Sequence, residues 1–485
     1  MKVMLVGWDG AEPSLVGELI AGGQMPNLAR LTRGGLLTEI ASTIRPESAV
    51  AWATLLTASP PAAHGVFGFA YHAPGSYRTR LYTTAGQHQP FLWERLSAAG
   101  LTSVAINPPM TYPPRPLRGA LVCGQMTPSA EHIFTYPADL SARLRAMGYP
   151  LDAEPPEPDE DREAYLARME AQVARRTEIA LDLLREQRWD FALVAYTELD
   201  RLQHFFWADM DAQHPAHARR QPTGRTTDGI ARHYRALDAA LGALLDVAHP
   251  DLAIIVSDHG FGPCSRKVHM NVWLRRLGLF IPKLSGAALG VGALSELRRL
   301  RRWAPARALK RRLLGQRPLV GHDLQTTAFE QGVEWQRTRA WFSEAGGIRI
   351  NLAGREPQGV VRPGQEYEAL RATLIDAALS LRDPLSGLPI FARAEPRESL
   401  YPGSPHLEAA PDIILETFHP RAHALQNHIP LSGHAASPDA AICADAFPYT
   451  ATHTDRALLA ANRPPDMPVA DLAGVGRWAL GAFGL

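Results

Sequence analysis

Short apolar runs alternate with longer segments of helical periodicity along most of the chain. The runs are rich in β-branched residues and end in a polar or charged residue, while segments such as QPFLWERLSAAG and HYRALDAALGALLDVA carry apolar residues at helical spacing. Continuous apolar strands with intervening helices indicate a mostly parallel sheet covered on both faces. We therefore predict a doubly wound α/β fold. Its predicted strands are VMLVG, LTSVAIN, FALVAYTEL, LAIIVSDHG and PDIILET.

Three segments interrupt this alternation. Residues 149–163 are acidic and proline-rich, which indicates a solvated loop. Residues 281–330 include the strongly basic RRLRRWAPARALKRRLLGQR, and residues 331–405 read as strands and turns before PDIILET returns the chain to the core. We expect an insertion that caps one edge of the sheet. The predicted units are a core of residues 1–280 and 406–485 and an inserted cap of residues 281–405.

The composition describes an ordinary globular protein. Of 485 residues, 46% are hydrophobic and 20% charged, which supplies ample core. The net charge of +1 gives no indication of a sequence-specific nucleic-acid partner. Three distant cysteines form no disulfide framework, and the apolar run at the N-terminus is too short for a signal peptide. With no apolar run of the roughly 18 to 20 residues that span a membrane, we predict a cytoplasmic protein without a transmembrane segment. Its oligomeric state is not revealed.

Acidic and histidine side chains stand where predicted strands stop. Asp9 follows the first strand in GWDG, TELDRLQH follows the third, and SDHG ends the fourth. Ligand sites of parallel sheets lie outside the carboxyl ends of the strands. Aspartate and histidine are suitable ligands for divalent metals such as Zn²⁺. A further histidine stands in SGHAASPD. The candidate metal ligands are Asp9, Asp200, His204, Asp258, His259 and His434.

Each motif alone also has an ordinary structural interpretation. Asp9 could be a helix N-cap, and an aspartate four residues before a histidine is common by chance. Asp258 fits a simple strand-to-loop turn, and a lone histidine such as His434 is more often a surface or core residue. The metal hypothesis gains its weight from the co-occurrence of all the motifs.

A candidate nucleophile, Ser48, begins an apolar helical run in PESAVAW. No G-x-S-x-G elbow surrounds it, which disfavours a Ser-His-Asp hydrolase. A helix N-terminus suits a phosphoryl group, although a plain N-cap serine fits the same position. Ser42 and Thr43 are competing hydroxyls. Two metals beside a nucleophilic oxygen, itself counted as a ligand, suit phosphate-ester hydrolysis.

The ordered set of motifs GWDG, SAVAWATLLTASPPAAHGVFGF, TELDRLQHFFW, SDHGFGP, INLAGREPQGVV, APDIIL and SGHAASPDA resembles the alkaline phosphatase superfamily, and more closely its type I phosphodiesterase and nucleotide pyrophosphatase branch, including its predicted phosphohydrolases and phosphomutases. The resemblance spans nearly the whole chain. It implies an alkaline-phosphatase-like fold with a capping insertion and two divalent ions, with Zn favoured over Mn or Fe. Asp200, His204 and His434 would hold one ion. Asp9, Ser48, Asp258 and His259 would hold the other, with Ser48 as the catalytic nucleophile.

Two departures from the family bear on the substrate. Animal nucleotide pyrophosphatases carry a phosphate-contacting asparagine where this chain has TTAGQHQPFLW, and the C-x-P-x-R motif of sulfatases is missing from the sequence. We predict a phosphodiesterase or nucleotide pyrophosphatase that acts on a small phosphate ester or nucleotide through a phosphoserine. A phosphomutase or phosphomonoesterase on the same site is the alternative, and a non-catalytic metal-binding protein is disfavoured.

The segment from Arg298 to Arg317 holds nine Lys or Arg and no acid. A solvated helix pair is one interpretation. A basic rim that steers an anionic substrate and a membrane-surface contact through Trp303 are the others.

Overall fold

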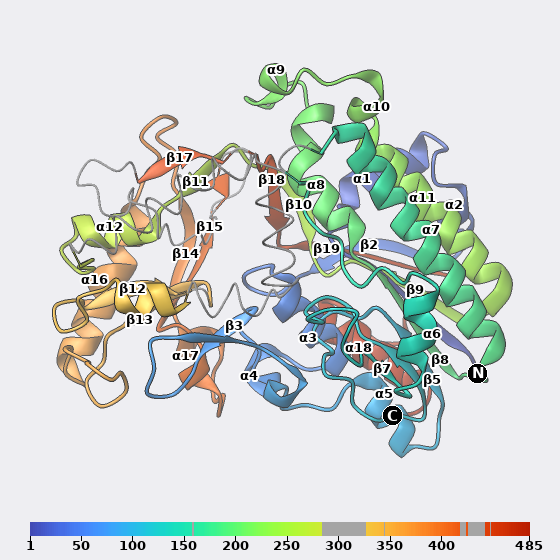
Figure 1. Ribbon diagram of the computed structural model, residues 1–485, viewed down its shortest axis with the longest axis horizontal. Coiled ribbons are helices and arrows are strands. Elements are labelled where there is room, and N and C mark those ends of the chain that lie inside the picture. The colour runs from blue at the N-terminus through green and yellow to red at the C-terminus, as the bar shows by residue number, and fades with distance from the viewer. Residues whose placement is uncertain (158–159, 284–325, 344, 418–422, 425–441, 447) are drawn as a thin grey trace.

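The computed structural model consists of a large sheet sandwiched between helices and a smaller second sheet beside it (Figure 1). The predicted basic segment and His434 lie outside the described residues. No described helix is long and apolar enough to cross a membrane. The structure describes residues 1–157, 160–283, 326–343, 345–417, 423–424, 442–446 and 448–485.

The main sheet has eight strands in the order β2-β19-β9-β1-β8-β5-β6-β7. The central strand β1 pairs in parallel with β8 and β9, with Trp8 opposite Tyr196 and Gly7 opposite Val256, so the three strands end at the same edge. β5 and β6 continue the parallel order, and β19 and β7 run antiparallel to their neighbours β9 and β6. β2 pairs antiparallel with β19 and so runs in the same direction as β1. This confirms the mostly parallel sheet. The strands are β1 Val3–Trp8, β2 Leu36–Ala41, β5 Ser103–Ile106, β6 Gly119–Val122, β7 Thr135–Tyr136, β8 Phe191–Tyr196, β9 Leu252–Val256 and β19 Arg456–Ala461.

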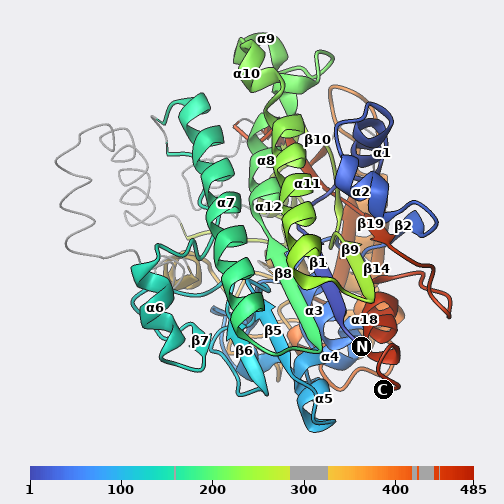
Figure 2. The same cartoon turned by 90° about the vertical axis from the view of Figure 1, so that its right-hand side faces the viewer.

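Helices cover both faces of this sheet, as a doubly wound fold requires. Figure 2 shows α7 (Arg162–Glu186), α8 (Glu198–Met210) and α11 (Gly229–Ala248) along one face. On the other face lie α3 (Ser48–Thr57), α5 (Leu92–Ala98) and α18 (Leu472–Gly481). The remaining helices are α1 Pro13–Ala21, α2 Pro26–Leu31, α4 Pro61–His64, α6 Leu140–Ala146, α9 His217–Arg220, α10 Gly224–Thr227, α12 Met270–Arg276, α16 Gln365–Ser380 and α17 Arg397–Leu400, with short 3-10 turns at Thr84–Gly86 and Leu407–Ala409.

α3 is buried along its whole length because it lies between the main sheet and α18. A Cβ atom at Gly7 of β1 would lie only 2.2 Å from the indole ring of Trp52. A glycine in the central strand therefore lets α3 approach the sheet closely, and Trp52 fills the space. This packing places the first residue of α3 against the carboxyl edge of β1.

The second sheet has the order β12-β13-β15-β14 and its own hydrophobic cluster. The prediction that PDIILET returns the chain to the main sheet is wrong, because β15 pairs antiparallel with β13 and β14. An apolar run identifies a buried strand but does not reveal which sheet it joins. The domain division at residues 281 and 405 stays a prediction. These strands are β12 Ala340–Ser343, β13 Gly347–Ile350, β14 Phe391–Pro396 and β15 Ile413–Thr417.

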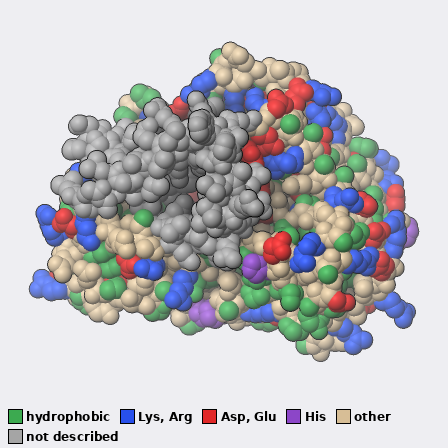
Figure 3. Space-filling view, in the orientation of Figure 1, with side chains coloured by type: hydrophobic (Ala, Val, Ile, Leu, Met, Phe, Trp, Pro, Cys, Tyr) green, Lys and Arg blue, Asp and Glu red, His purple; other side chains and the backbone are tan. Residues whose placement is uncertain are grey.

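The other described strands are short and form small separate sheets outside the two larger ones. β10 pairs with β18, β11 lies between β16 and β17, and β3 pairs with β4. Figure 3 shows acidic and basic side chains mixed over the described part of one face, in keeping with the small net charge. The short strands are β3 Ala70–His72, β4 Thr79–Leu81, β10 Gly260–Pro263, β11 Arg266–Val268, β16 His423–Ala424, β17 Cys443–Asp445 and β18 Ala451–Thr454.

Candidate metal centre

Three carboxylates meet at the carboxyl edge of the central strands. Asp9 follows β1 directly, Asp258 lies two residues beyond β9, and Asp200 lies in the first turn of α8 after β8. Asp258 Oδ1 accepts a hydrogen bond from the backbone N–H of Gly10 at 3.1 Å. Asp9 Oδ2 accepts one from Trp52 Nε1 at 2.9 Å. The parallel register of β8, β1 and β9 therefore brings together three acids that are far apart in the sequence.

Three histidines face these carboxylates, and each has its Nδ1 next to a backbone carbonyl. The Nδ1 atoms of His204, His259 and His453 lie 3.0, 3.1 and 2.7 Å from the carbonyl oxygens of Ala451, Gly260 and Pro46. A carbonyl only accepts, so each Nδ1 carries a proton, and when the ring is neutral the lone pair of Nε2 faces the acids. This arrangement is the usual support for a histidine that ligates a metal through Nε2.

The distances divide these side chains into two groups. In group one, Asp200 Oδ1 lies 3.1 Å from His453 Nε2 and 3.5 Å from His204 Nε2. In group two, His259 Nε2 lies 3.2 Å from Asp258 Oδ2 and 3.8 Å from Asp9 Oδ1. Asp200 Oδ1 is also 4.0 Å from His259 Nε2, so it lies between the groups. Group one is Asp200, His204 and His453, and group two is Asp9, Asp258 and His259.

The donors fit divalent cations. The Nε2 atoms of His204 and His453 lie 3.1 Å apart, so when both rings are neutral with Nδ1 protonated, two lone pairs face each other. Among the described residues, Asp9 Oδ1 and Asp258 Oδ2 are buried without a hydrogen-bond donor. Buried acceptors that face one another without donors are costly, and a cation between them removes that cost.

The electrostatics of the carboxylates agree with this. Burial, followed by repulsion from Asp200, raises the pKa of Asp258 to about 7. Burial and the charges of Asp258 and Asp200 raise the pKa of Asp9 well above its ordinary value. Burial also opposes the charge of Asp200, but its histidine neighbours His204 and His453 outweigh that effect and hold its pKa below the ordinary value. The protein alone therefore leaves two of its three acids without enough positive charge nearby.

The hydroxyl of Ser48 lies beside group two. Ser48 is the first residue of α3 and is buried, and its Oγ lies 3.2 Å from His259 Nε2. The competing hydroxyls are used elsewhere: Ser42 Oγ donates to the Asp258 carbonyl at 2.6 Å, and Thr43 Oγ1 donates to the Arg45 carbonyl at 3.0 Å. Of the three hydroxyls, Ser48 is the one that faces the candidate ligands.

The structure thus brings together five of the six predicted ligands with Ser48, and it decides two of the ordinary interpretations. The N-cap of α1 is Glu12 and that of α3 is Glu47, so neither Asp9 nor Ser48 is an N-cap. His434 lies outside the described residues, and its role stays a prediction.

Sequence reasoning missed His453. This histidine lies in the short strand β18, opposite Phe261 of β10 and just before β19. Because β19 pairs antiparallel with β9, it begins at the edge where the parallel strands end. The available signal was a histidine just before the apolar run RALLAA.

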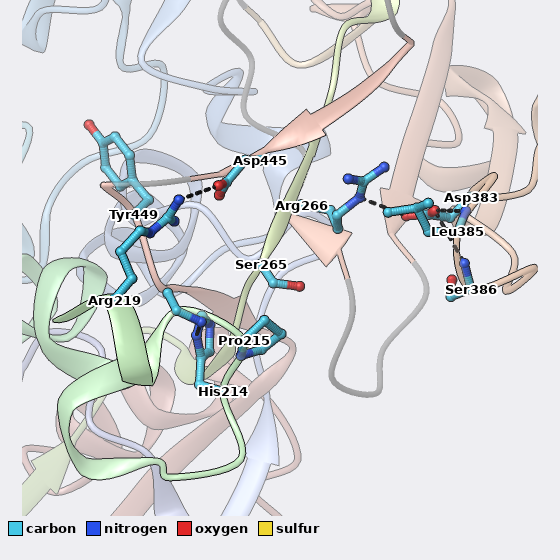
Figure 4. Close-up of a pocket in the computed structure, with 11 residues that line it drawn as sticks. His214, Pro215, Arg219, Ser265, Arg266, Asp383, Leu385, Ser386, Asp445 and Tyr449 are labelled. Carbon is cyan, nitrogen blue, oxygen red and sulfur yellow. Dashed lines mark hydrogen bonds and ion pairs between the residues drawn. The ribbon is translucent and has the colours of Figure 1, made fainter. Parts of the chain in front are cut away.

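One cleft adjoins group one. A cleft of about 500 Å³ is lined by Tyr449, whose ring packs edge-on against His204 with centroids 5.7 Å apart. In Figure 4, Arg219 points to Asp445 and Arg266 to Asp383, so positive and negative charges on its walls are paired.

A second cavity, of about 330 Å³, lies beyond the carboxyl end of β6. Its walls include Gln125, Met126, Tyr149 and Asp152. Within the described structure, Gln125 Oε1 and Tyr149 Oη are buried without a hydrogen-bond partner. The cavity therefore has polar groups available for a bound molecule.

A family model described as type I phosphodiesterase / nucleotide pyrophosphatase matches residues 3–434. No curated protein matches the chain. The match covers most of the chain, including all the described candidate residues except His453.

Solved structures with the same fold include phosphonoacetate hydrolase from Sinorhizobium meliloti 1021. Its complexes with phosphonoformate and phosphonoacetate give TM-scores of 0.57 and 0.55, each at 15% identity over 99% of this chain and 95% of that one. Human ectonucleotide pyrophosphatase / phosphodiesterase 5 gives 0.49 at 11% identity over 100% and 95%. At such identities, the likeness to the hydrolase shows the fold alone, and it confirms the predicted alkaline-phosphatase-like class.

Proposed function

Since the chain belongs to the type I phosphodiesterase/nucleotide pyrophosphatase family, we propose that it hydrolyses phosphoric diesters or pyrophosphates with Ser48 as nucleophile and two divalent ions as cofactors. Family membership makes the chain a phosphoryl hydrolase. The observation that carries the finer proposal is the buried Ser48 hydroxyl, which faces His259 Nε2 beside two groups of metal-ligand side chains.

Group one and group two would each hold one ion. We favour Zn²⁺, because imidazole and carboxylate ligands in this mixture suit it, with Mn²⁺ or Fe as alternatives. In this proposal His453 completes group one, for which the sequence suggested His434. Bound divalent ions would supply Lewis acidity and positive charge to a phosphoryl group.

The protein's own groups orient the reaction. Ser48 lies at the N-terminus of α3, where backbone N–H groups and the helix dipole favour a negative phosphoryl group. Ser48 releases its proton to solvent, its Oγ forms a bond to phosphorus, and the bond to the leaving oxygen breaks as that oxygen gains a proton. Water then cleaves the Oγ–phosphorus bond and restores the hydroxyl. One water is consumed, and the products are a phosphomonoester and an alcohol, or two phosphates.

A diester needs room for its second substituent, and the cavity beyond β6 provides it. β5 lies between β6 and β8, and neighbouring strands are about 4.8 Å apart, so the end of β6 lies about 10 Å from the end of β8. The helix α8, which carries Asp200, begins just after β8. Arg201, the residue after Asp200, donates from Nε to the Ala153 carbonyl at 2.9 Å, next to the cavity-lining Asp152. The cavity thus lies within reach of a molecule whose phosphorus is at the metal centre.

The proposal is tested by assaying p-nitrophenyl phosphate, bis-p-nitrophenyl phosphate and a dinucleotide, each with Zn²⁺ and with Mn²⁺. We expect metal-dependent release of a phosphomonoester from the diester, with a phosphoserine trapped at Ser48 by acid quenching. Inorganic phosphate or a relocated phosphate as the main product would instead indicate a phosphomonoesterase or phosphomutase. Metal binding without hydrolysis of any ester would contradict an enzymatic function.

A further inference from the structure

Residues 42–47, here called the nucleophile loop, lead from β2 into α3 and touch both groups of candidate ligands. Ser42 Oγ donates to the carbonyl of Asp258 in group two. The Pro46 carbonyl accepts from Nδ1 of His453 in group one at 2.7 Å. The next residue after the loop is Ser48. A displacement of this loop would therefore disturb the nucleophile and the orientation of a metal ligand together.

The backbone of this loop is strained at one residue. Arg45 has φ 60°, a left-handed conformation that residues other than glycine adopt at a cost. Its carbonyl accepts from the backbone N–H of Glu47 at 2.8 Å and from Thr43 Oγ1. Such a conformation persists only where the surrounding structure holds it in place, and it occurs preferentially at functional sites.

The side chain of Arg45 ties the loop to the second sheet. Arg45 Nη1 donates to the carbonyl of Ala345, 300 residues away, at 2.7 Å, and Nη2 lies 3.6 Å from Glu47 Oε2. The side chains of Arg45 and Glu47 are only 14% and 15% exposed. Because both charges are shielded from water, their contact and the bond to the carbonyl are stronger than they would be on the surface.

Gly346 makes this contact possible. It lies between β12 and β13, and a Cβ atom built on it would stand 1.2 Å from Arg45 Nη1 and 1.6 Å from Cζ. The guanidinium therefore occupies the space of the missing side chain. Any other residue at position 346 would displace the arginine, and the φ of +83° at Gly346 disfavours other residues as well.

We propose that Arg45 is a positioning residue: by lying on Gly346 and bonding to Ala345, it makes the second sheet the support that fixes the nucleophile loop, and hence Ser48 and His453. This inference rests on the proposed function in one respect, that Ser48 is the nucleophile. Its other consequence, the orientation of His453, concerns metal binding alone.

A double-mutant cycle tests the contact, using Arg45→Ala, Gly346→Ala and the double variant. We expect each single variant to lower kcat for bis-p-nitrophenyl phosphate at least about tenfold with little change in KM, because small misplacements of reacting groups are costly. Zn²⁺ affinity, measured by equilibrium dialysis, should fall by about tenfold as His453 loses its carbonyl partner. In the double variant the second change should add little, since both remove one contact.

Gly354→Ala is the matched control. Gly354 has a φ of +85°, and a Cβ built on it meets nothing within 4 Å, so this variant measures the cost of the backbone conformation alone. It should leave kcat and Zn²⁺ affinity unchanged. Additive losses in the double variant, in kcat and in metal affinity, would contradict the inference in an active enzyme. If the wild-type protein hydrolyses no ester, the proposed function fails, whereas the cycle in Zn²⁺ affinity still decides whether Arg45 positions His453.

Discussion

The two groups of candidate ligands differ in burial and in how the fold assembles them. In group two, Asp9, Asp258 and His259 are 2%, 0% and 0% exposed, and they follow the two neighbouring parallel strands β1 and β9. In group one, the exposed fractions of Asp200, His204 and His453 are 11%, 15% and 20%, and the residues come from α8 and from the short strand β18.

Under the proposed function, this difference gives the two groups different tasks. Group two lies deeper and adjoins Ser48, which suits the fixed geometry that a nucleophile needs. Group one is more exposed and adjoins the cleft lined by Tyr449, which suits exchange of water, product and metal. Asp200, which lies between the groups, couples them.

The largest expected effect on the comparison comes from removing the hydroxyl of the proposed nucleophile. Ser48→Ala should lower kcat by at least about 10³-fold, because the covalent path is lost. Metal content should stay at two ions per chain, since the carboxylates and histidines remain. Turnover of bis-p-nitrophenyl phosphate and elemental analysis measure both quantities.

Ser42→Ala and Thr43→Val serve as controls, because they remove the competing hydroxyls while keeping Ser48. Both should stay far more active than Ser48→Ala. Wild-type turnover in Ser48→Ala would show that another group is the nucleophile. Group two would then have no special task in holding Ser48.

The membership of group one is tested next. His453→Ala should lower Zn²⁺ affinity at group one by about 100-fold or more, since loss of a direct ligand exceeds the usual 10- to 100-fold effect of losing a supporting group. His434→Ala, the variant of the residue chosen from the sequence, should bind Zn²⁺ as wild type does. The opposite result would restore His434 to the site and exclude His453 from it.

The same contrast explains what the sequence could and could not reveal. Asp9, Asp200 and Asp258 were predictable because a parallel sheet gathers the residues that follow its strands at one edge. His453 lies in β18, just before the antiparallel strand β19, and the apolar residues of β19 do not reveal its direction. For the same reason β15 was predicted in the main sheet although it pairs in the second. The contact of Arg45 with Ala345 joins residues 300 positions apart, which no local pattern records.

Chelation tests whether the difference in burial controls the order in which the two ions leave. On addition of EDTA to the two-metal protein, we expect the ion at group one to leave first, because its histidines are partly exposed while group two is buried. Metal release followed with a chromogenic chelator should show two phases, and His453→Ala should abolish the fast one. A single phase for the wild type would mean that the two groups open together.

The smallest expected effect concerns the hydrogen bond by which α3 supports a ligand of group two. Trp52 Nε1 donates to Asp9 Oδ2, so Trp52→Phe removes a hydrogen bond from a metal-ligand carboxylate and should lower Zn²⁺ affinity by about tenfold. The smaller ring also leaves a cavity over Gly7, so some stability is lost regardless of the metal. Trp93→Phe separates the two effects: Trp93 is also fully buried, and its Nε1 has no partner among the described residues. Both variants should unfold at a lower temperature, but only Trp52→Phe should bind Zn²⁺ more weakly. Equal metal affinities in the two variants would show that Asp9 needs no support from α3 and that burial alone distinguishes group two.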